Sequence, residues 1–291
     1  MSAQLAQYLV SGITAGAIYA LVALGFALIH NASGVINFAQ GEFVMIGGMA
    51  AAGFVEAGIP LPLAAGAAIL AAALAGVLLE KLAIEPAREA PVVTLIIITI
   101  GASILIRGLA TIAWDKKIHR LPAFSGEAPL AIGGASLLPQ VLWVLAVSAL
   151  AVAALTWFFR ATLAGKAMLA VAHNRLAARL AGISVRRVLT ASFGLSAALG
   201  ALAGVLVAPI AFTSWDAGVM LGLKGFAAAI LGGMGSGAGA VIGGLALGLL
   251  EALGAGYLSS AYKDVFAFLV ILAALVFLPH GLLGRRAATR V

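Results

Sequence analysis

Few residues of this chain could do chemistry, and the clearest group lies in the segment 34–49. Asn37, Gln40 and Glu42 occur there inside an otherwise apolar run. An intramembrane carboxylate costs about 3 kcal/mol or more unless it is paired or hydrated, so these side chains are expected to face protein or water. Gly41 and the glycines that follow favour a discontinuous helix, whose terminal N–H or C=O groups could meet a solute.

These residues are therefore candidates for lining a pathway through a membrane. The alternative is that Asn37 and Glu42 only satisfy the polar groups of a broken helix end near the cytoplasmic surface. The sequence leaves both interpretations open.

A glycine-rich turn at 232–237 is the second candidate for the pathway. It contains Gly232, Gly233, Gly235 and Ser236, and glycine tolerates the backbone angles that a re-entrant break requires. Small residues recur around it at spacings of three and four, which predicts tight helix packing as its main role. A nucleotide-binding loop would end in Gly-Lys-Ser or Gly-Lys-Thr, a sequence that the chain lacks.

A basic segment at 160–187 is the third candidate, and it holds six of the seventeen Lys and Arg residues. Arg175 and Arg179 lie four positions apart and share one face of a predicted helix, while Lys166 and His173 share another. The segment is too short to be a domain and too helical in composition to be a simple linker. We interpret it as a docking element on the cytoplasmic side.

Small residues support this interpretation of the segment. Ala177, Ala178 and Ala181 offer a low surface that a neighbour's backbone could approach, and Gly182 can end the helix. The alternative is an interfacial helix whose basic residues meet anionic lipid head groups.

Catalysis and metal binding are not predicted. The four histidines are dispersed singly, without carboxylates that could complete a metal site. No Ser, His and Asp arrangement indicates hydrolysis, and the absence of cysteine removes disulfides and thiolate metal sites.

Isolated charges are expected to be solvated. One set lies near the predicted outer ends of membrane spans, where side chains reach the aqueous interface: Arg107, Lys224, Glu251, Lys263 and Asp264. The mixed charges between Glu80 and Glu89 are expected to form a solvated loop, and the alternative is that they lock neighbouring helices or contact a partner.

The composition places these candidates in a membrane protein. Hydrophobic residues make up 64% of the chain and charged residues 9%, with a mean hydropathy of +1.17, whereas soluble domains carry about a quarter charged residues. The apolar runs are continuous and rich in Ala and Leu, which predicts helices rather than a barrel of alternating strands. The net charge of +7 lies in short connections, so it does not indicate nucleic-acid binding.

About eight spans are predicted, each of the roughly 20 residues that a bilayer requires. They lie at about 5–29, 34–56, 62–80, 92–113, 138–159, 188–211, 225–256 and 264–282. The 225–256 run is too long and glycine-broken for one helix, so eight to ten membrane segments are expected. The fold class is all-α, with broken or re-entrant helices, and the chain 1–291 forms one transmembrane domain.

The positive-inside rule predicts the orientation of the chain. If the C-terminal Arg285, Arg286 and Arg290 are cytoplasmic, eight passes place 81–91 and 160–187 inside as well. The N-terminus and the 114–137 connection then lie outside, although that connection also carries basic residues.

Over nearly its whole length the chain resembles the membrane permeases of high-affinity branched-chain amino acid ABC transporters, specifically the shorter of their two permease subunits. The resemblance rests on the stretches 34–48, 99–108, 177–183, 224–244 and 262–285, in that order and spacing. Permeases for urea, short amides and other amino acids are similar, so the resemblance specifies the family better than the solute.

The resemblance implies a non-catalytic subunit of an inner-membrane importer. An external solute-binding protein would deliver an amino acid, branched-chain in the first instance, to a pair of permeases, the second being a related chain or a second copy. Two cytoplasmic ATPases would bind ATP and Mg, so this chain needs no cofactor of its own. The coupling helix falls at about 165–182, although Leu176 stands where the wider motif has an acidic residue.

Two rival functions remain open at this point. An ion-coupled secondary carrier could use Glu42 as a proton or cation site. A structural membrane scaffold would transport nothing.

Overall fold

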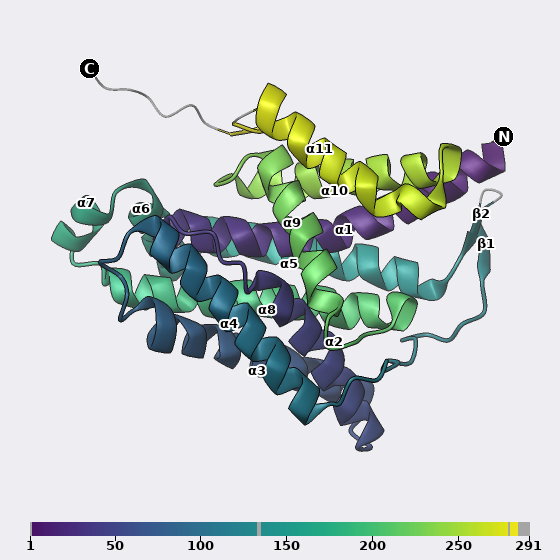
Figure 1. Cartoon of the computed structure of the whole chain (residues 1–291), viewed down its shortest axis with the longest axis horizontal. Helices are drawn as coiled ribbons and strands as arrows, with labels where there is room; N and C mark the ends of the chain where they lie inside the picture. Colours follow the sequence, from purple (N-terminus) through teal and green to yellow (C-terminus); the bar gives the residue numbers. More distant parts are fainter. Residues whose placement is uncertain (1, 133–134, 279, 285–291) are drawn as a thin grey trace.

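The computed structural model describes residues 2–132, 135–278 and 280–284. Within them the predicted all-α fold is confirmed, and a small antiparallel hairpin of β1 (Leu130–Ile132) and β2 (Ala135–Leu137) is added to it (Figure 1). In this part of the chain seven helices are long and apolar enough to cross a membrane.

The helices follow the predicted spans closely, and their bounds are α1 (Ser2–Ser33), α2 (Gln40–Glu56), α3 (Leu61–Leu79), α4 (Val92–Ala113), α5 (Pro139–Ala161), α6 (Leu163–His173), α7 (Arg175–Leu180), α8 (Val185–Ala211), α9 (Ala217–Gly232), α10 (Gly237–Tyr257) and α11 (Lys263–Phe277). A π-helical turn, Glu80–Ile84, extends α3, and a 3-10 turn, Ser260–Tyr262, precedes α11.

The 225–256 run divides where α9 ends and α10 begins, as its glycines indicated. The break expected from Gly41 and the glycines that follow it is wrong, because α2 continues through them and packs on α8 and α9 there. The irregular part of the 34–56 run is 34–39, before these glycines. The short helices α2 and α9 join the seven long ones in the bundle, which agrees with the predicted eight to ten segments.

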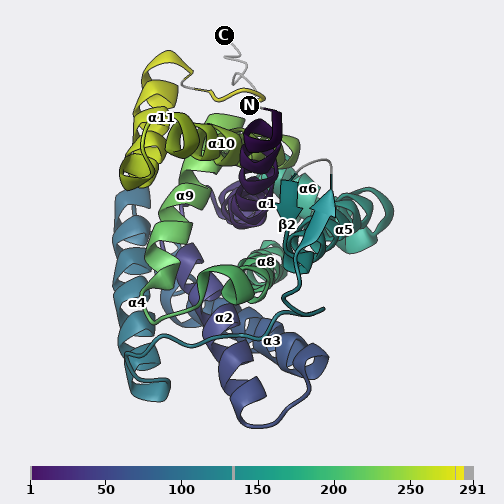
Figure 2. The ribbon, with the colours of Figure 1, turned by 90° about the vertical axis from the view of Figure 1, so that its right-hand side faces the viewer.

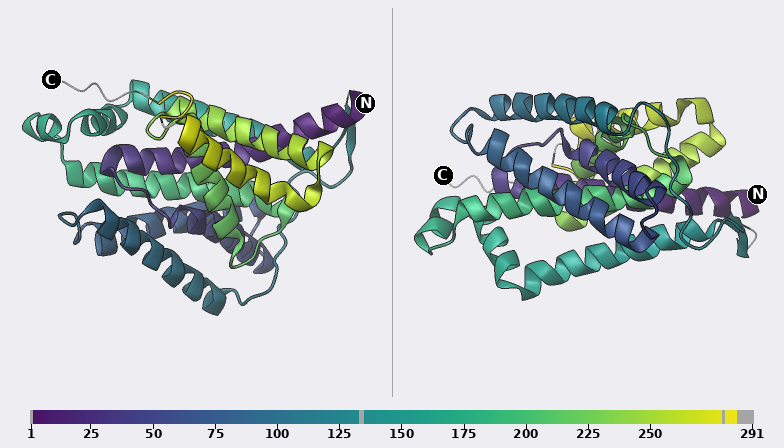
Figure 3. Two further views of the ribbon diagram at one scale, coloured as in Figure 1. Left: turned by 45° about the horizontal axis from the view of Figure 1, so that its top comes forward. Right: turned by 90° about the horizontal axis from the view of Figure 1, so that it is seen from below.

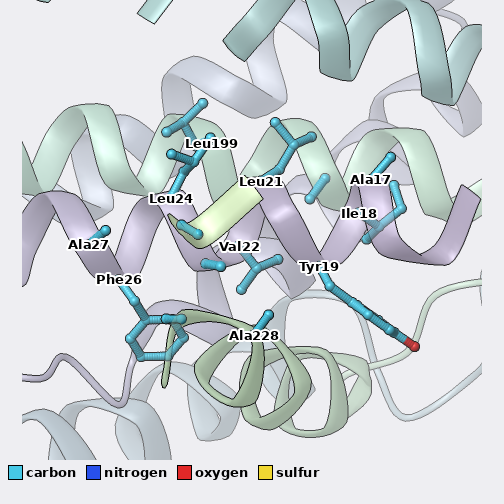
Figure 4. Close-up of a cluster of buried hydrophobic side chains, with 14 of the residues drawn as sticks. Ala17, Ile18, Tyr19, Leu21, Val22, Leu24, Phe26, Ala27, Leu199 and Ala228 are labelled. Carbon is cyan, nitrogen blue, oxygen red and sulfur yellow. The ribbon is translucent and has the colours of Figure 1, made fainter. Parts of the chain in front are cut away.

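The core of the bundle surrounds the middle of α1. Leu21, Val22 and Ala23 are completely buried, and side chains of α8, α9 and α10 pack around them (Figure 4). Most helices at the surface of a soluble protein have one polar face, but α1 is apolar on all sides because neighbours or lipid cover all of it.

The α9–α10 pair packs through the glycines that the sequence singled out. A Cβ at Gly239 would lie 2.3 Å from the Gly232 carbonyl oxygen, and one at Gly243 would lie 2.1 Å from the Ala228 carbonyl oxygen. Only glycine permits this approach, so the predicted packing role of the small-residue spacing is confirmed.

Three features of the arrangement position the candidate site. α9 crosses the direction shared by α1, α8 and α10 (Figure 1). α4 runs along one edge of the bundle, beside α9 and α2 (Figure 2). α6 and α7 project at one end, away from the β1–β2 hairpin (Figure 3).

Candidate functional site

The segment 34–39 is an irregular stretch between α1 and α2, held by polar contacts inside the bundle. Gly34 turns the chain with a φ of 70°. The Phe38 N–H donates to Thr99 Oγ1 on α4 at 3.1 Å, and the Ala39 N–H donates to Asn37 Oδ1 at 3.1 Å. Asn37 is fully buried, and its Nδ2 has no hydrogen-bond partner within the part of the chain that the structure describes. α2 therefore begins within the bundle, after this stretch.

Gln40 connects three helices. Its Nε2 donates to the Ser196 carbonyl oxygen at 3.1 Å, and its Oε1 accepts from Ser196 Oγ at 2.7 Å. Gly25 makes room for it, since a Cβ there would lie 2.1 Å from Gln40 Nε2. Gln40 thus fastens α2 to α1 and α8. Its assignment to a substrate pathway stays a prediction.

Glu42 lies two residues further, against α4. Its side chain is 2% exposed, its Oε1 accepts from Ser103 Oγ at 2.7 Å, and Arg107 Nε lies 3.2 Å from the same oxygen. The other carboxylate oxygen, Oε2, has no hydrogen-bond partner among the described residues. Arg107 was predicted to extend to the aqueous interface. That prediction is wrong, because the buried carboxylate attracts the guanidinium inward.

A cavity of about 160 Å³ adjoins this pair. α2, α4 and α9 enclose it together with Phe26 of α1 and Phe38 of the irregular segment. Gly41 also lines it and approaches Gly218 of α9 so closely that a Cβ would lie 2.1 Å from the Gly218 carbonyl oxygen. The structure therefore brings Gly41 and Glu42 together at one cavity, whereas Gln40 is directed away from it.

The glycine turn lies elsewhere. Gly233 and Gly235 have φ values of 105° and 104°, and Ser236 caps α10 by accepting from the Gly239 N–H at 3.0 Å. Asn31, near the end of α1, donates to the Gly235 carbonyl oxygen at 3.0 Å. The predicted break is confirmed, but it adjoins the end of α1 and α6, not the Glu42 cavity.

A second cavity, of about 560 Å³, lies between α1, α5, α6 and α10 beside this turn. Its walls are mostly apolar, with Asn31, Thr156 and Arg160 among the polar exceptions. Among the described residues, no carboxylate lines this second cavity. Of the two cavities, therefore, only the Glu42 cavity has both a positive and a negative side chain in its wall.

The basic segment forms two helices rather than the single predicted one. Asn174 ends α6 and caps α7, with its Oδ1 accepting from the Ala177 N–H at 3.0 Å. Gly182 follows α7 with a φ of 80°, as expected of a residue that ends a helix. Lys166, His173 and Arg179 are exposed.

One face of α6–α7 packs on the bundle. Met168, Val171 and Ala178 are buried against Ala32, Val185 and Val188, at the end of α1 and the start of α8. Ala178 was expected on an open surface for a neighbouring protein. That expectation is wrong, because this alanine contacts the chain's own bundle and only Ala177 and Ala181 stay exposed.

Arg175 also points toward the bundle. Its Nη2 donates to the Ala32 carbonyl oxygen at 2.8 Å. Carbonyl groups at the end of a helix lack partners within that helix, so the guanidinium fastens α7 to the last turn of α1.

The outer face of α6–α7 carries leucines that the sequence analysis did not select. Leu163, Leu176 and Leu180 are 86%, 68% and 83% exposed. In a chain full of leucines no local pattern distinguishes these three. Exposed apolar residues among basic ones are typical of a contact surface for another protein.

The loops divide between two ends of the bundle as the charge rule predicted. Arg186 forms an ion pair with Glu85, so the 80–91 connection and the basic segment share one end. At the other end the Ser136 N–H donates to Gln7 Oε1 at 3.1 Å, which places the start of α1 beside the 114–137 connection. Arg285, Arg286 and Arg290 lie outside the described residues.

Other charges were predicted to be solvated and are buried instead. Lys224 and Glu251 are 6% and 1% exposed, and Lys224 Nζ donates to Glu251 Oε1 at 3.0 Å. Glu80 is 1% exposed and accepts from Thr190 Oγ1 at 2.7 Å. These predictions failed because each charge finds a partner far away in the sequence.

Comparison with known proteins agrees with the predicted resemblance. The family model for "Branched-chain amino acid transport system / permease component" matches residues 8–275. The high-affinity branched-chain amino acid transport system permease protein LivH of Escherichia coli K12 is 36% identical over 98% of this chain and 97% of its own length. BraD of Pseudomonas aeruginosa, with the same description, is 33% identical over 98% and 97%.

A more distant relative has a different cargo in its name. The autoinducer 2 import system permease protein LsrC of Escherichia coli is 30% identical over 88% of this chain and 75% of its own length. The family match, the near-complete overlap with LivH and the helical bundle agree with one another. The chain is therefore a member of the branched-chain amino acid transport system permease family, a multi-pass, non-catalytic membrane subunit.

Proposed function

We propose that this chain is the translocating subunit of an ATP-driven importer in a bacterial inner membrane, with an amino acid as its cargo and a branched-chain one in the first instance. An external binding protein delivers the cargo, and the chain pairs with a second permease, either a related chain or another copy. Two ATPases bind from the cytoplasm and carry the ATP and Mg. The N-terminus is outside and the C-terminus is cytoplasmic.

The observation that carries this proposal is the form of α6–α7. Its inner face packs on α1 and α8, and Leu176, Leu180 and Arg179 of α7 are exposed. The two helices project at one end of the bundle (Figure 3). An element that only rested on lipid would need an apolar face directed to the membrane. Here the inner apolar face is already covered by the chain itself, so the outer leucines are free for a cytoplasmic protein.

The contacts of α6–α7 supply a route for motion. An ATPase can shift the permease between conformations only through contacts that differ between them. Displacing α7 moves Arg175, which holds the Ala32 carbonyl oxygen at the end of α1. The irregular segment 34–39 follows directly and leads to Glu42. A movement at the docking surface thus reaches the cavity through a short stretch of chain.

The alternative of an ion-coupled carrier has weaker support. A site for a coupling cation needs a net negative charge, whereas Arg107 neutralises Glu42. The family match alone does not specify the cargo, because one relative is a permease named for autoinducer 2.

The experiment is reconstitution of the complete transporter in proteoliposomes, with ATP inside and the loaded binding protein outside. Uptake of leucine that requires ATP supports the proposal. Uptake by this chain alone, driven by an ion gradient, contradicts it and supports the carrier.

A charge reversal tests the docking element. Arg179→Glu inverts a charge on the outer face of α7, and we expect it to reduce copurification of the ATPases and uptake together. Arg120→Glu is the matched control, because Arg120 is an exposed arginine at the opposite end. Equal copurification and uptake in both variants would refute docking at α7.

A further inference from the structure

The Glu42 cavity is lined by a carboxylate and a guanidinium, and the contact between these two groups leaves atoms of both without a hydrogen bond. Glu42 Oε2 is buried without a partner, and Arg107 Nε lies 3.2 Å from Glu42 Oε1 without an aligned hydrogen bond. Buried polar atoms are nearly always hydrogen-bonded, and each exception requires an explanation. A ligand that donates to the carboxylate and accepts from the guanidinium would satisfy both groups.

The rest of the cavity wall is apolar. Phe26, Phe38 and Phe226 contribute aromatic rings, and Ile100 and Leu223 contribute aliphatic side chains. The volume of about 160 Å³ corresponds to roughly five water molecules at about 30 Å³ each. The cavity therefore fits one small solute that has a charged end and an apolar end.

The charge balance of the cavity selects the kind of solute. Glu42 and Arg107 together are neutral, so a cation or an anion alone would add a net charge to a site of low polarity, which is unfavourable. A zwitterion adds none. Both residues line the cavity, so the zwitterion's ammonium can donate to the Glu42 carboxylate and its carboxylate can accept from the Arg107 guanidinium.

We propose that this cavity is a transient binding site for an aliphatic α-amino acid on its way through the permease. The ammonium pairs with Glu42, the carboxylate pairs with Arg107, and the aliphatic side chain lies against Phe26, Phe38 and Phe226. The site rests on the proposed function, which supplies the cargo class, and it locates where in this chain the cargo binds. Because Arg107 and Glu42 also pair with each other, their pair competes with the cargo and keeps binding weak enough for release.

The test measures equilibrium binding without the binding protein. The assembled transporter in lipid nanodiscs is titrated with radiolabelled L-leucine at millimolar concentrations. Competitors are 4-methylpentanoate, which lacks the ammonium, and 3-methylbutylamine, which lacks the carboxylate. We expect saturable binding that leucine displaces and that neither singly charged analogue displaces at equal concentration.

Variants connect this binding to the cavity. Glu42→Gln and Arg107→Gln should each weaken leucine binding at least about tenfold, the effect of losing one charged hydrogen bond. Leu223→Trp should abolish it by filling the cavity while both charges stay. Glu80→Gln is the matched control, because it also converts a buried carboxylate to an amide but does not line this cavity. It should bind leucine normally.

The outcomes separate the two proposals. ATP-dependent leucine uptake with no leucine binding, or with equal binding in Glu42→Gln, Leu223→Trp and wild type, overturns the site and leaves the importer standing. Displacement by either singly charged analogue also overturns the zwitterion assignment. Absence of ATP-dependent uptake refutes the importer, whereas leucine binding that is lost in the cavity variants would still support the site.

Discussion

Four charges of alternating sign meet where α9, α10 and α11 come together. Glu251 Oε1 lies 3.2 Å from Lys263 Nζ and 3.0 Å from Lys224 Nζ, and Lys224 Nζ lies 2.6 Å from Asp264 Oδ1. The inner side chains, Lys224 and Glu251, are 7% and 1% exposed, whereas Lys263 and Asp264 are 53% and 49% exposed. Tyr19 adds a hydrogen bond from α1 to Glu251 Oε2 at 2.8 Å.

The arrangement predicts the cost of removing an inner charge. Removing one member of an isolated buried pair destabilises a protein by about 3–5 kcal/mol, and losing one hydrogen bond to a charged group costs about 1.5–3 kcal/mol. After Lys224→Met, Glu251 keeps Lys263, so we expect a loss of about 2–3 kcal/mol. Glu251→Gln should cost a similar amount, because Lys224 keeps Asp264.

The double variant Lys224→Met with Glu251→Gln gives the sharper result. It leaves only the half-exposed Lys263 and Asp264, which water can solvate, so we expect the double loss to fall short of the sum by about 1–2 kcal/mol. The free energy of unfolding is measured by denaturant titration in detergent micelles, with the exposed Lys116→Met as the control. If each single variant lowers the free energy of unfolding by less than about 0.5 kcal/mol, or if the two losses are strictly additive, this account of the four charges is refuted.

Further predictions concern helix packing and pH. A Cβ at Gly248 would lie 2.3 Å from the Gly16 backbone nitrogen, whereas Gly101 has open space around it. Gly248→Leu should therefore prevent stable folding, and Gly101→Leu should not. The measurement is the yield of monodisperse protein. The hydrogen bond from His119 to Glu56 raises the pKa of the His119 imidazole. The stabilisation from this contact is therefore full below about pH 6.5 and is lost as pH rises through the raised pKa. The melting temperature of His119→Gln should fall below that of wild type at pH 5.5 and approach it at higher pH, and a pH-independent difference would contradict this assignment.

The fold could be predicted from the sequence where the signal is local. The length of the apolar run at 92–113 predicted α4 with its observed bounds, and the glycines at 232–237 indicated the break between α9 and α10. Gly182 was recognised as the end of a helix because a positive φ after the last turn favours glycine. Each of these features depends on residues that are close together in the chain.

The site could be predicted only in part, because its contacts join distant residues. Asn37, Gln40 and Glu42 were recognised as polar residues in an apolar run, but nothing near them indicated that Gln40 fastens helices while Glu42 faces a cavity. The pairing of Glu42 with Arg107 depends on how α2 and α4 pack.

The docking surface shows the same limit. Leu180 is 83% exposed and Ala178 is 3% exposed, although both lie in the same short helix. Which of them faces outward depends on how α7 packs on α1 and α8. The charge pattern located the segment, and the packing of the bundle determines its outer face.

The most direct measurement of the central claim is photocrosslinking from α7. The chain contains no cysteine, so Leu180→Cys can carry a benzophenone label at a single position, with Leu138→Cys at the opposite end as the comparison. In the assembled transporter we predict that the label at 180 crosslinks to an ATPase and that the label at 138 does not. Crosslinking to an ATPase from 138 and not from 180 would contradict the claim that α6–α7 is the surface through which ATP drives this permease.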